Sequence, residues 1–324
     1  FERVLALVPN AADAHYNLAV TLQANGDLEG ARARYERVLE LDASIAEAHN
    51  NLGLVLLGLG RPRTAIERYR QALELRPDFA EAHHNLGAAL RYTGRPDAGI
   101  ASLEQALALR PDLARAHNEI GVALNDRGEP DAARRRFERA LELQPAYADA
   151  LWNLSGTARS VDEARAWLER CLTADPEHEG ARMTGPALAA WAGAPDAFHA
   201  LLTTGDRDHP YVRAFRWALA LPRRPELHFH RWSLYDAMIA RCERGRPFYE
   251  FGVWRGTSFR YLARKLGRGF GFDTFEGLPE DWHDVERGNY SSDGRIPRID
   301  GGEFVAGRFE DTLPPFFAEP RPLA

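Results

Sequence analysis

Small and apolar residues recur along the first half of the chain with a period of 34 residues. The repeated small residues are Ala-His pairs that begin at Ala14, Ala48, Ala82 and Ala116, and glycines at Gly26, Gly60, Gly94 and Gly128. Large apolar residues recur at Tyr35, Tyr69, Leu103 and Phe137, and prolines at Pro77, Pro111 and Pro145, with Pro9 in the same phase. Each period therefore predicts two closely packed helices, a glycine turn between them and a proline that ends the second helix.

This pattern resembles the tetratricopeptide repeat over residues 1–177, and the segment Ala48–Gly53 is similar to the superhelix of O-linked N-acetylglucosamine transferases. One helix pair cannot bury its apolar face alone, so the resemblance implies an α-solenoid of stacked pairs. The fifth period has only 31 residues, with three missing near Ser160, and we expect this repeat to close the array against the next domain. The chain begins at Phe1 with what resembles the end of an earlier repeat, so we expect a truncated array.

Asparagine occupies one position of the first predicted helix in four repeats, at Asn17, Asn51, Asn85 and Asn153, with Glu119 as the exception. The resemblance implies that this helix lines the concave face, where such asparagines hold peptide backbone in the resembling transferases. An amide can donate and accept, which suits the backbone of an extended peptide. The sequence thus predicts a protein or peptide partner on the concave face. The alternative is that asparagine is simply common at this position. The neighbouring positions are mixed and would add side-chain selectivity: Tyr16, Asn50, His84, Asn118 and Trp152.

The periodic histidines do not predict a metal site. Successive repeats lie on the order of 20 Å apart, whereas the ligands of one metal lie roughly 2 Å from it. We expect these histidines to pack at the start of each first helix. The two cysteines, Cys171 and Cys242, are far apart and outside any CxxC motif, so neither a zinc site nor a disulfide framework is indicated.

Residues 178–245 lose the period and keep apolar helical stretches at 187–192, 211–221 and 232–242. Prolines separate these stretches, so we expect a short helical connector that packs on the second domain. His228 and His230 form an HxH pair, but no acidic or cysteine partner stands at a ligand spacing. An ordinary surface or strand segment is the favoured interpretation of this pair.

From Phe248 the pattern changes to alternating strands and helices. A buried strand at 248–253 leads through a turn to a helix at 259–266, and a second strand follows at 269–275. A strand–helix–strand unit of this kind has a right-handed crossover and parallel strands. A third strand is expected at 304–308.

The turn after the first strand separates two kinds of cofactor. A dinucleotide fold requires G-x-G-x-x-G there, whereas this chain has Gly252 and Gly256 with Glu250 ahead of them. This E-x-G-x-x-x-G turn suits S-adenosylmethionine, because no pyrophosphate has to be bound and glycines let the backbone approach the cofactor. Asp273, at the end of the second strand, is placed to accept hydrogen bonds from both ribose hydroxyls.

Three segments resemble class I methyltransferases, and more narrowly the macrocin O-methyltransferase-like group: YEFGVWRGTS from Tyr249, FDTFEGLPEDW from Phe272 and FVAGRFEDTLP from Phe304. The resemblance implies a partial α/β Rossmann-like domain over residues 246–324. It places Glu250, Gly252 and Gly256 near the methionine end of S-adenosylmethionine, Asp273 on the ribose, Phe275 and Glu276 along the site, and Phe309, Glu310 and Asp311 near the adenine. Asp311 with Thr312 could equally form a helix N-cap. The polar segment 280–303 is expected to form a lid.

The resemblance implies an S-adenosylmethionine-dependent methyltransferase, acting on oxygen, whose repeats recruit the acceptor. It also implies that aspartates beyond Ala324 bind a divalent metal, so no general base is assigned and we expect this chain alone to be inactive. The alternative is a non-catalytic repeat scaffold with a vestigial or cofactor-sensing domain. The repeats resemble those of a glycosyltransferase, but no catalytic segment for that activity is present.

The composition excludes several other classes of function. The formal net charge of −6 does not predict nucleic-acid binding. No run of 18 apolar residues occurs, so the sequence predicts no membrane span. No signal peptide is visible, and we therefore expect a cytoplasmic location.

Overall fold

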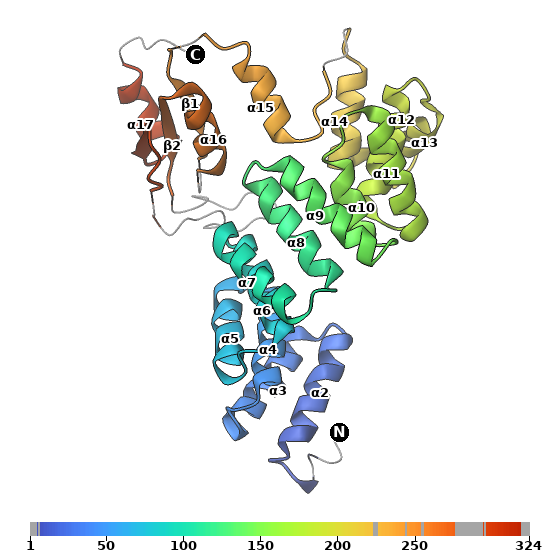
Figure 1. The fold of residues 1–324 in the computed structure, drawn as a ribbon, viewed down its shortest axis with the longest axis vertical. Coiled ribbons are helices and arrows are strands. Elements are labelled where there is room, and N and C mark those ends of the chain that lie inside the picture. Colours follow the sequence, from blue (N-terminus) through green and yellow to red (C-terminus); the bar gives the residue numbers. More distant parts are fainter. Residues whose placement is uncertain are drawn as a thin grey trace. The chain divides into compact units, whose positions relative to one another are not determined.

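The computed structural model describes residue 5, residues 7–222, 226–243, 245–253 and 256–275, residue 294 and residues 296–318. The chain separates into two compact units, Phe1–Pro225 and Glu226–Ala324 (Figure 1). The first unit is helical and contains the repeats. The second contains a small parallel sheet with helices.

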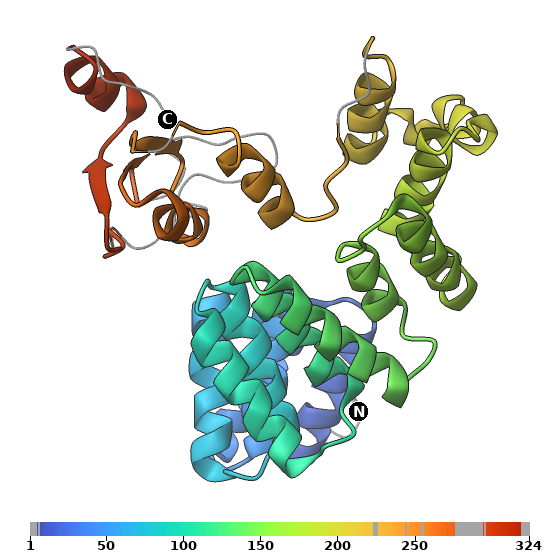
Figure 2. The same ribbon diagram turned by 45° about the horizontal axis from the view of Figure 1, so that its top comes forward.

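The repeats fold as antiparallel helix pairs stacked side by side (Figures 1 and 2). We call the first helix of each pair helix A and the second helix B. The A helices are α2 (Ala12–Ala24), α4 (Ala46–Gly58), α6 (Ala80–Tyr92), α8 (Ala114–Asp126) and α10 (Ala148–Ser155). The B helices are α3 (Leu28–Leu41), α5 (Pro62–Leu75), α7 (Pro96–Leu109), α9 (Pro130–Leu143) and α11 (Val161–Ala174). The predicted solenoid of helix pairs is confirmed.

The repeated residues hold each pair together as their sizes predict. A Cβ added at Gly53 would overlap the Tyr69 ring, and one added at Gly121 would overlap the Phe137 ring, so only glycine lets the two helices approach this closely. Tyr69 and Phe137 are almost fully buried. The glycines between helix A and helix B have positive φ, as a tight turn after a helix requires: Gly26, Gly60, Gly94 and Gly128.

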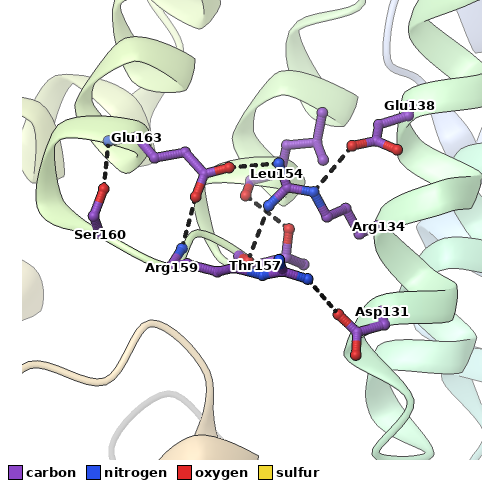
Figure 3. A network of polar contacts seen from close by, with 8 residues as sticks. All are labelled: Asp131, Arg134, Glu138, Leu154, Thr157, Arg159, Ser160 and Glu163. Atoms are coloured by element: carbon purple, nitrogen blue, oxygen red, sulfur yellow. Dashed lines mark hydrogen bonds and ion pairs between the residues drawn. The ribbon is translucent and has the colours of Figure 1, made fainter.

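The fifth repeat is three residues shorter because its helix A loses five residues and the turn that follows gains two. Helix α10 has 8 residues, whereas α8 has 13. A polar network stabilises the turn that follows (Figure 3). Ser160 caps α11 by accepting the N–H of Glu163 at 3.1 Å, and the Glu163 carboxylate accepts the backbone N–H of Arg159 at 2.8 Å. The same carboxylate pairs with Arg134 of α9, which ties the shortened repeat to the one before it.

The helical array continues beyond the fifth repeat. Helix α12 (Glu179–Trp191) packs on α11 and is followed by α13 (Asp196–Leu202), the 3₁₀ helix η1 (Gly205–Asp208) and α14 (Pro210–Leu219). Met183, Phe198 and Val212 form a shared apolar core among these helices. The fifth repeat therefore does not close the array. The segment expected to form one connector on the second domain divides instead, with 178–225 in the first unit and only α15 (Arg231–Ile239) in the second.

The second unit contains β1 (Phe248–Phe251), α16 (Thr257–Leu266), β2 (Gly269–Asp273), β3 (Gly302–Ala306) and α17 (Phe309–Phe316). Its three-stranded sheet is parallel, in the order β1-β2-β3. Strand β1 ends before Gly252, and β2 ends at Asp273, so both strands are shorter than the sequence predicted. The third strand begins two residues earlier than expected, at Gly302.

Aromatic residues cover both faces of this sheet. On the α16 face, the Phe259 ring lies 4.8 Å from that of Phe248 and 4.7 Å from that of Phe304. On the α17 face, the rings of Phe272 and Phe316 lie 4.8 Å apart, edge to face. The two helices therefore fix the sheet between them (Figure 1). Among the described residues, no helix is both long and apolar enough to cross a membrane.

Candidate functional site

The asparagines of the A helices link consecutive repeats. Asn51 donates from Nδ2 to the Tyr16 hydroxyl, Asn85 to Oδ1 of Asn50, and Asn153 to Oδ1 of Asn118, each at 2.9 Å. The acceptor always stands 35 residues earlier, one position before the equivalent residue of the preceding repeat, which is Asn17, Asn51 or Glu119. The array itself therefore orients these amides.

The amides keep part of their hydrogen-bonding capacity. Each amide has two N–H donors and two oxygen lone pairs, and the hydrogen bonds of Asn51 and Asn85 to described residues use only some of them. Both side chains are half-buried, and Asn17 in the first repeat is exposed. At the fourth repeat, Glu119 replaces asparagine and accepts from Arg91 of α6 at 3.0 Å, so this position also links neighbouring A helices.

In the first four repeats, apolar side chains stand three positions after Asn17, Asn51, Asn85 and Glu119, on the same side of each A helix. They are Val20, Leu54, Ala88 and Val122, and we call this row the apolar stripe. Val20 is 41% exposed and Leu54 is 37% exposed, whereas Ala88 and Val122 are half-buried. We call Asn17, Asn51, Asn85 and Asn153 the asparagine row. The asparagine row and the apolar stripe run next to each other along the surface formed by the A helices, which we call the A-helix side.

The periodic histidines pack at the start of the A helices, as predicted. Nε2 of His15 lies 2.9 Å from the carbonyl oxygen of Pro9, and Nε2 of His49 lies 3.1 Å from that of Ala43. Each ring thus bonds the backbone six residues earlier, in the turn between repeats. Burial lowers the pKa of His49, which keeps the ring neutral. Nowhere in the described ranges do three His, Cys, Asp or Glu side chains gather as metal ligands would.

The candidate cofactor residues of the second unit meet at one edge of the sheet. The turn from Gly252 to Gly256 follows β1, Asp273 ends β2, and Gly307 follows β3. Because the strands are parallel, their carboxyl ends share this edge, where ligands bind in open α/β sheets. Asp273 Oδ1 accepts the backbone N–H of Phe275 at 2.9 Å, which fixes the carboxylate at the strand end.

Glu250 is a half-buried acid near this edge of the sheet, and its pKa is shifted. Its side chain lies on the α16 face, where the Ser258 hydroxyl donates to Oε1. Burial raises the pKa of Glu250 above its usual value. Its second oxygen, Oε2, is buried and has no hydrogen-bond partner among the described residues. A buried acceptor without a donor is costly, and a ligand that donates a hydrogen bond would satisfy it.

The two glycines of the turn differ in their surroundings. Gly252 has a φ of 78°, and a Cβ added there would meet no described atom within 4 Å, so its backbone is open to a ligand. Gly256 has a φ of 72° and caps α16, but Pro297 and Ile299 lie against it. Close packing within the unit therefore explains why glycine stands at position 256, and no ligand is needed to explain it. Glu250 and Gly252 fit a bound cofactor better than Gly256 does.

The other candidate residues lie farther from an open site. Phe275 is 1% exposed and packs in the core of the second unit, so its ring faces other apolar side chains in this structure. Glu310 and Asp311 are exposed in the first turn of α17. Arg308 is the N-cap residue of this helix, which excludes the alternative that Asp311 caps it. Glu276 and most of the expected lid, 280–293 and 295, lie outside the described residues.

The repeats identify the family of the first unit. Residues 10–78 and 78–146 match one description of the tetratricopeptide repeat, and residues 126–179 match a second. Residues 10–179, more than half of the chain, therefore belong to the tetratricopeptide-repeat family. No curated protein matches the chain.

Several solved structures have a similar fold. The chain is 22% identical to PilW, a type IV pilus biogenesis factor, with a TM-score of 0.57 over 63% of this chain and 97% of that one. It is 23% identical to pilF of Pseudomonas aeruginosa, with a TM-score of 0.56 over 64% and 97%. The Cut9–Hcn1 complex of APC/C gives 16% identity and a TM-score of 0.60 over 68% and 45%. At these identities the likeness establishes the helical fold alone.

Proposed function

We propose that the repeat array binds an extended segment of a partner protein along the A-helix side. A tetratricopeptide-repeat scaffold is suited to binding proteins or peptides. The observation that carries the proposal is the pairing of the asparagine row with the apolar stripe. The half-buried amides can still meet a peptide backbone, and exposed Val20 and Leu54 can meet its apolar side chains.

Packing between the repeats supports an array that curves with its A helices on the concave side. Helix α4 contacts α6, α6 contacts α8, and α8 contacts α10, whereas contacts between consecutive B helices are sparser. Helices that approach one another more closely on one side make the array curve toward that side. A curved inner surface would surround an extended peptide and bury more of it than a flat surface could.

The experiment compares two exposed leucines on different helix types. Peptides are selected from a random display library on the native protein, and their affinities are measured for Leu54→Glu and Leu75→Glu variants. Leu54 lies on α4 in the apolar stripe, and Leu75, 45% exposed, ends helix B α5. Leu54→Glu should weaken binding at least about tenfold, because a charge would be buried against the peptide. Equal loss in both variants, or none in either, would refute an A-helix binding side.

We propose a second function for the second unit, the binding of S-adenosylmethionine for methyl transfer to an oxygen. The observation that favours it is the unsatisfied Oε2 of Glu250 near the open turn at Gly252. When bound, the cofactor would supply an activated methyl group on its sulfonium. Glu250 would accept a hydrogen bond from the methionine end and Asp273 from the ribose. Burial of Glu250 would exclude water from that contact. No residue is assigned as the base.

Calorimetric titration with S-adenosylhomocysteine tests the second function. Micromolar binding should be lost in Asp273→Ala and retained in Glu243→Ala, a matched acid that is exposed and precedes β1 at the opposite edge of the sheet. Retained peptide binding without cofactor binding in the folded protein would leave a non-catalytic repeat scaffold as the function. Equal binding by both variants would rule out Asp273 as a ribose ligand.

A further inference from the structure

A cluster of aromatic rings lies where α10, α12 and α14 meet, at the end of the array. The Trp152 ring of α10 lies 5.3 Å from that of His178, and 6.4 Å from that of Tyr211. The Tyr211 ring lies 5.3 Å from that of His209. Trp152 occupies the A-helix position that in earlier repeats accepts the asparagine hydrogen bonds, at Tyr16, Asn50 and Asn118, so the cluster adjoins the asparagine row.

Hydrogen bonds fix the two histidine rings of this cluster. His178 Nδ1 accepts the backbone N–H of Ala181 at 3.3 Å as the N-cap of α12, and His209 Nδ1 accepts that of Tyr211 at 3.3 Å as the N-cap of α14. Nδ1 must therefore be unprotonated in both rings, which places the ring proton of each neutral imidazole on Nε2. The rings cannot turn without losing their caps.

Carboxylates stand beside the same rings. Oδ1 of Asp149 lies 3.8 Å from Nε2 of His178, and Oε1 of Glu179 lies 3.3 Å from Nε2 of His209. Both acids remain open to solvent, with 63% and 79% of their side chains exposed. Arg182 of α12 pairs with other acids, with Glu177 at 3.3 Å and with Asp206 at 3.8 Å. Asp149 and Glu179 thus keep a net negative charge beside the rings.

The cluster also offers ring surface to solvent. Tyr211 is 47% exposed and Trp152 is half-buried. A Cβ added at Gly180 would lie 2.7 Å from the Trp152 ring, so glycine at this position lets α12 hold the indole closely. Ring surface in a fixed position beside carboxylates suits a planar cation, which stacks on aromatic rings and pairs with carboxylates.

We propose that this cluster binds an arginine side chain of the partner protein. The guanidinium would lie over the Trp152 and Tyr211 rings and pair with Asp149 and Glu179. Arginine fits better than lysine, because its planar group stacks and donates in a fork, whereas an ammonium is a compact and strongly hydrated charge. The site would give the bound segment its direction, because it lies at one end of the A-helix row. This inference extends the proposed partner binding, but it is tested without a peptide.

The experiment follows the indole N–H resonance of Trp152 by nitrogen-15 NMR of the native protein, assigned with Trp152→Phe. The probes are Nα-acetyl-arginine methylamide and the matched citrulline compound, which has the same shape without the charge. The arginine compound should shift the resonance saturably, and the citrulline compound should bind at least about fivefold more weakly. Equal binding of the two compounds would overturn the proposal.

Matched variants test whether the arginine compound binds at the aromatic cluster. Tyr211→Ala and Glu179→Gln should each weaken arginine binding at least about threefold. Trp217→Ala, an exposed aromatic residue elsewhere on α14, and Glu169→Gln, an exposed acid on α11, should leave it unchanged. Native affinity in both cluster variants would overturn the proposal. Failure here would leave the leucine experiment on the apolar stripe unaffected, so the two proposals fail separately.

Discussion

His49 shows how one side chain serves the connection between repeats. It lies at the start of helix A and reaches back to the carbonyl oxygen of Ala43, in the turn that ends the repeat before. His83 makes the same contact with Pro77 at 2.9 Å. A backbone carbonyl at a helix end needs a donor, and the imidazole supplies one at this turn. The periodic histidine is therefore a structural residue of the turn.

We expect the array to lose stability as the pH falls below about 6.5, the usual histidine pKa. Burial lowers the pKa values of His49, His84 and His117 in the folded protein. In this range the unfolded chain binds protons that the folded chain does not, so acid favours unfolding. Thermal unfolding followed by circular dichroism across this range measures the effect. His84→Gln should reduce the dependence on pH, and His199→Gln, at an exposed position on α13, should not.

Glu250 makes stability depend on pH in the opposite direction to the buried histidines. Burial raises its pKa above 4.5 in the folded protein, so the folded state favours the protonated acid. The stability of the second unit should therefore fall as the pH rises through the range just above 4.5. Glu250→Gln should raise the stability of this unit at neutral pH and flatten that dependence, as measured by hydrogen exchange of strand β1. Unchanged exchange in the variant would contradict the burial of the charge.

At the scale of elements, polar contacts hold the turn that follows the short helix α10. Losing the last turn of helix A removes apolar contacts with helix B, and the network of Arg134, Arg159 and Glu163 occupies this junction (Figure 3). The Arg134 and Glu163 side chains are only 19% and 28% exposed. Because the pair is partly shielded from water, it should contribute more than an exposed ion pair does.

Arg134→Ala should destabilise the first unit by about 1–2 kcal/mol, because Glu163 and the carbonyl of Thr157 would lose their donor. Arg139→Ala is the matched control on the same helix, since its pair with Glu142 is exposed and should be worth less than about 0.5 kcal/mol. Thermal unfolding of both variants gives the comparison. Equal shifts would show that the network adds nothing beyond a surface ion pair.

At the scale of the whole molecule, the chain consists of two units with separate cores. The first core runs along the stacked repeats, and the second surrounds Phe248, Phe259 and Phe304. Stability in a repeat array comes from each repeat and its neighbours, whereas the second unit depends on one small sheet and the helices that cover it. The two units should therefore respond separately to changes in their cores.

Calorimetry of the native protein should show distinct transitions for the two units. Phe137→Ala and Phe259→Ala remove equally buried rings, one from each core. Each substitution should cost about 3–5 kcal/mol in its own unit. Phe137→Ala should lower only the transition of the array, and Phe259→Ala only that of the second unit. A shift of both transitions by either variant would indicate that the two units unfold together.

The features that were predicted best from the sequence depend on contacts within one repeat. Gly53 and Tyr69 meet within one repeat, so a period of 34 residues was enough to predict their pairing. Helix α17 was expected only as an alternative, because Pro314 and Pro315 suppress the helical signal in its sequence, and its start at Phe309 was missed. The capping of α11 was also missed, although the spacing of Ser160 and Glu163 is that of a capping box and could have revealed it.

The candidate sites were harder to predict from the sequence. The asparagine row was recognised, but its bonds to the preceding repeat depend on how two A helices are offset, which no local pattern shows. Phe275 was placed in the cofactor site because of its neighbours in sequence, whereas its side chain enters the core. Arg134 and Glu163 stand 29 residues apart and meet only because α9 and α11 both pack against the short helix α10.

The constant offset of the asparagine bonds has a consequence for how the array could change in length. If residues 46–79 were removed, Asn85 would follow Tyr16 by the same 35 positions that now separate Asn51 from Tyr16. The His83 ring would likewise face the Ala43 carbonyl in place of the Pro77 carbonyl. Gene rearrangements that delete or duplicate one whole unit would thus rejoin matching surfaces. Deletion of the fourth repeat would differ, because it would remove Arg134 and with it the pair that Glu163 makes across the junction.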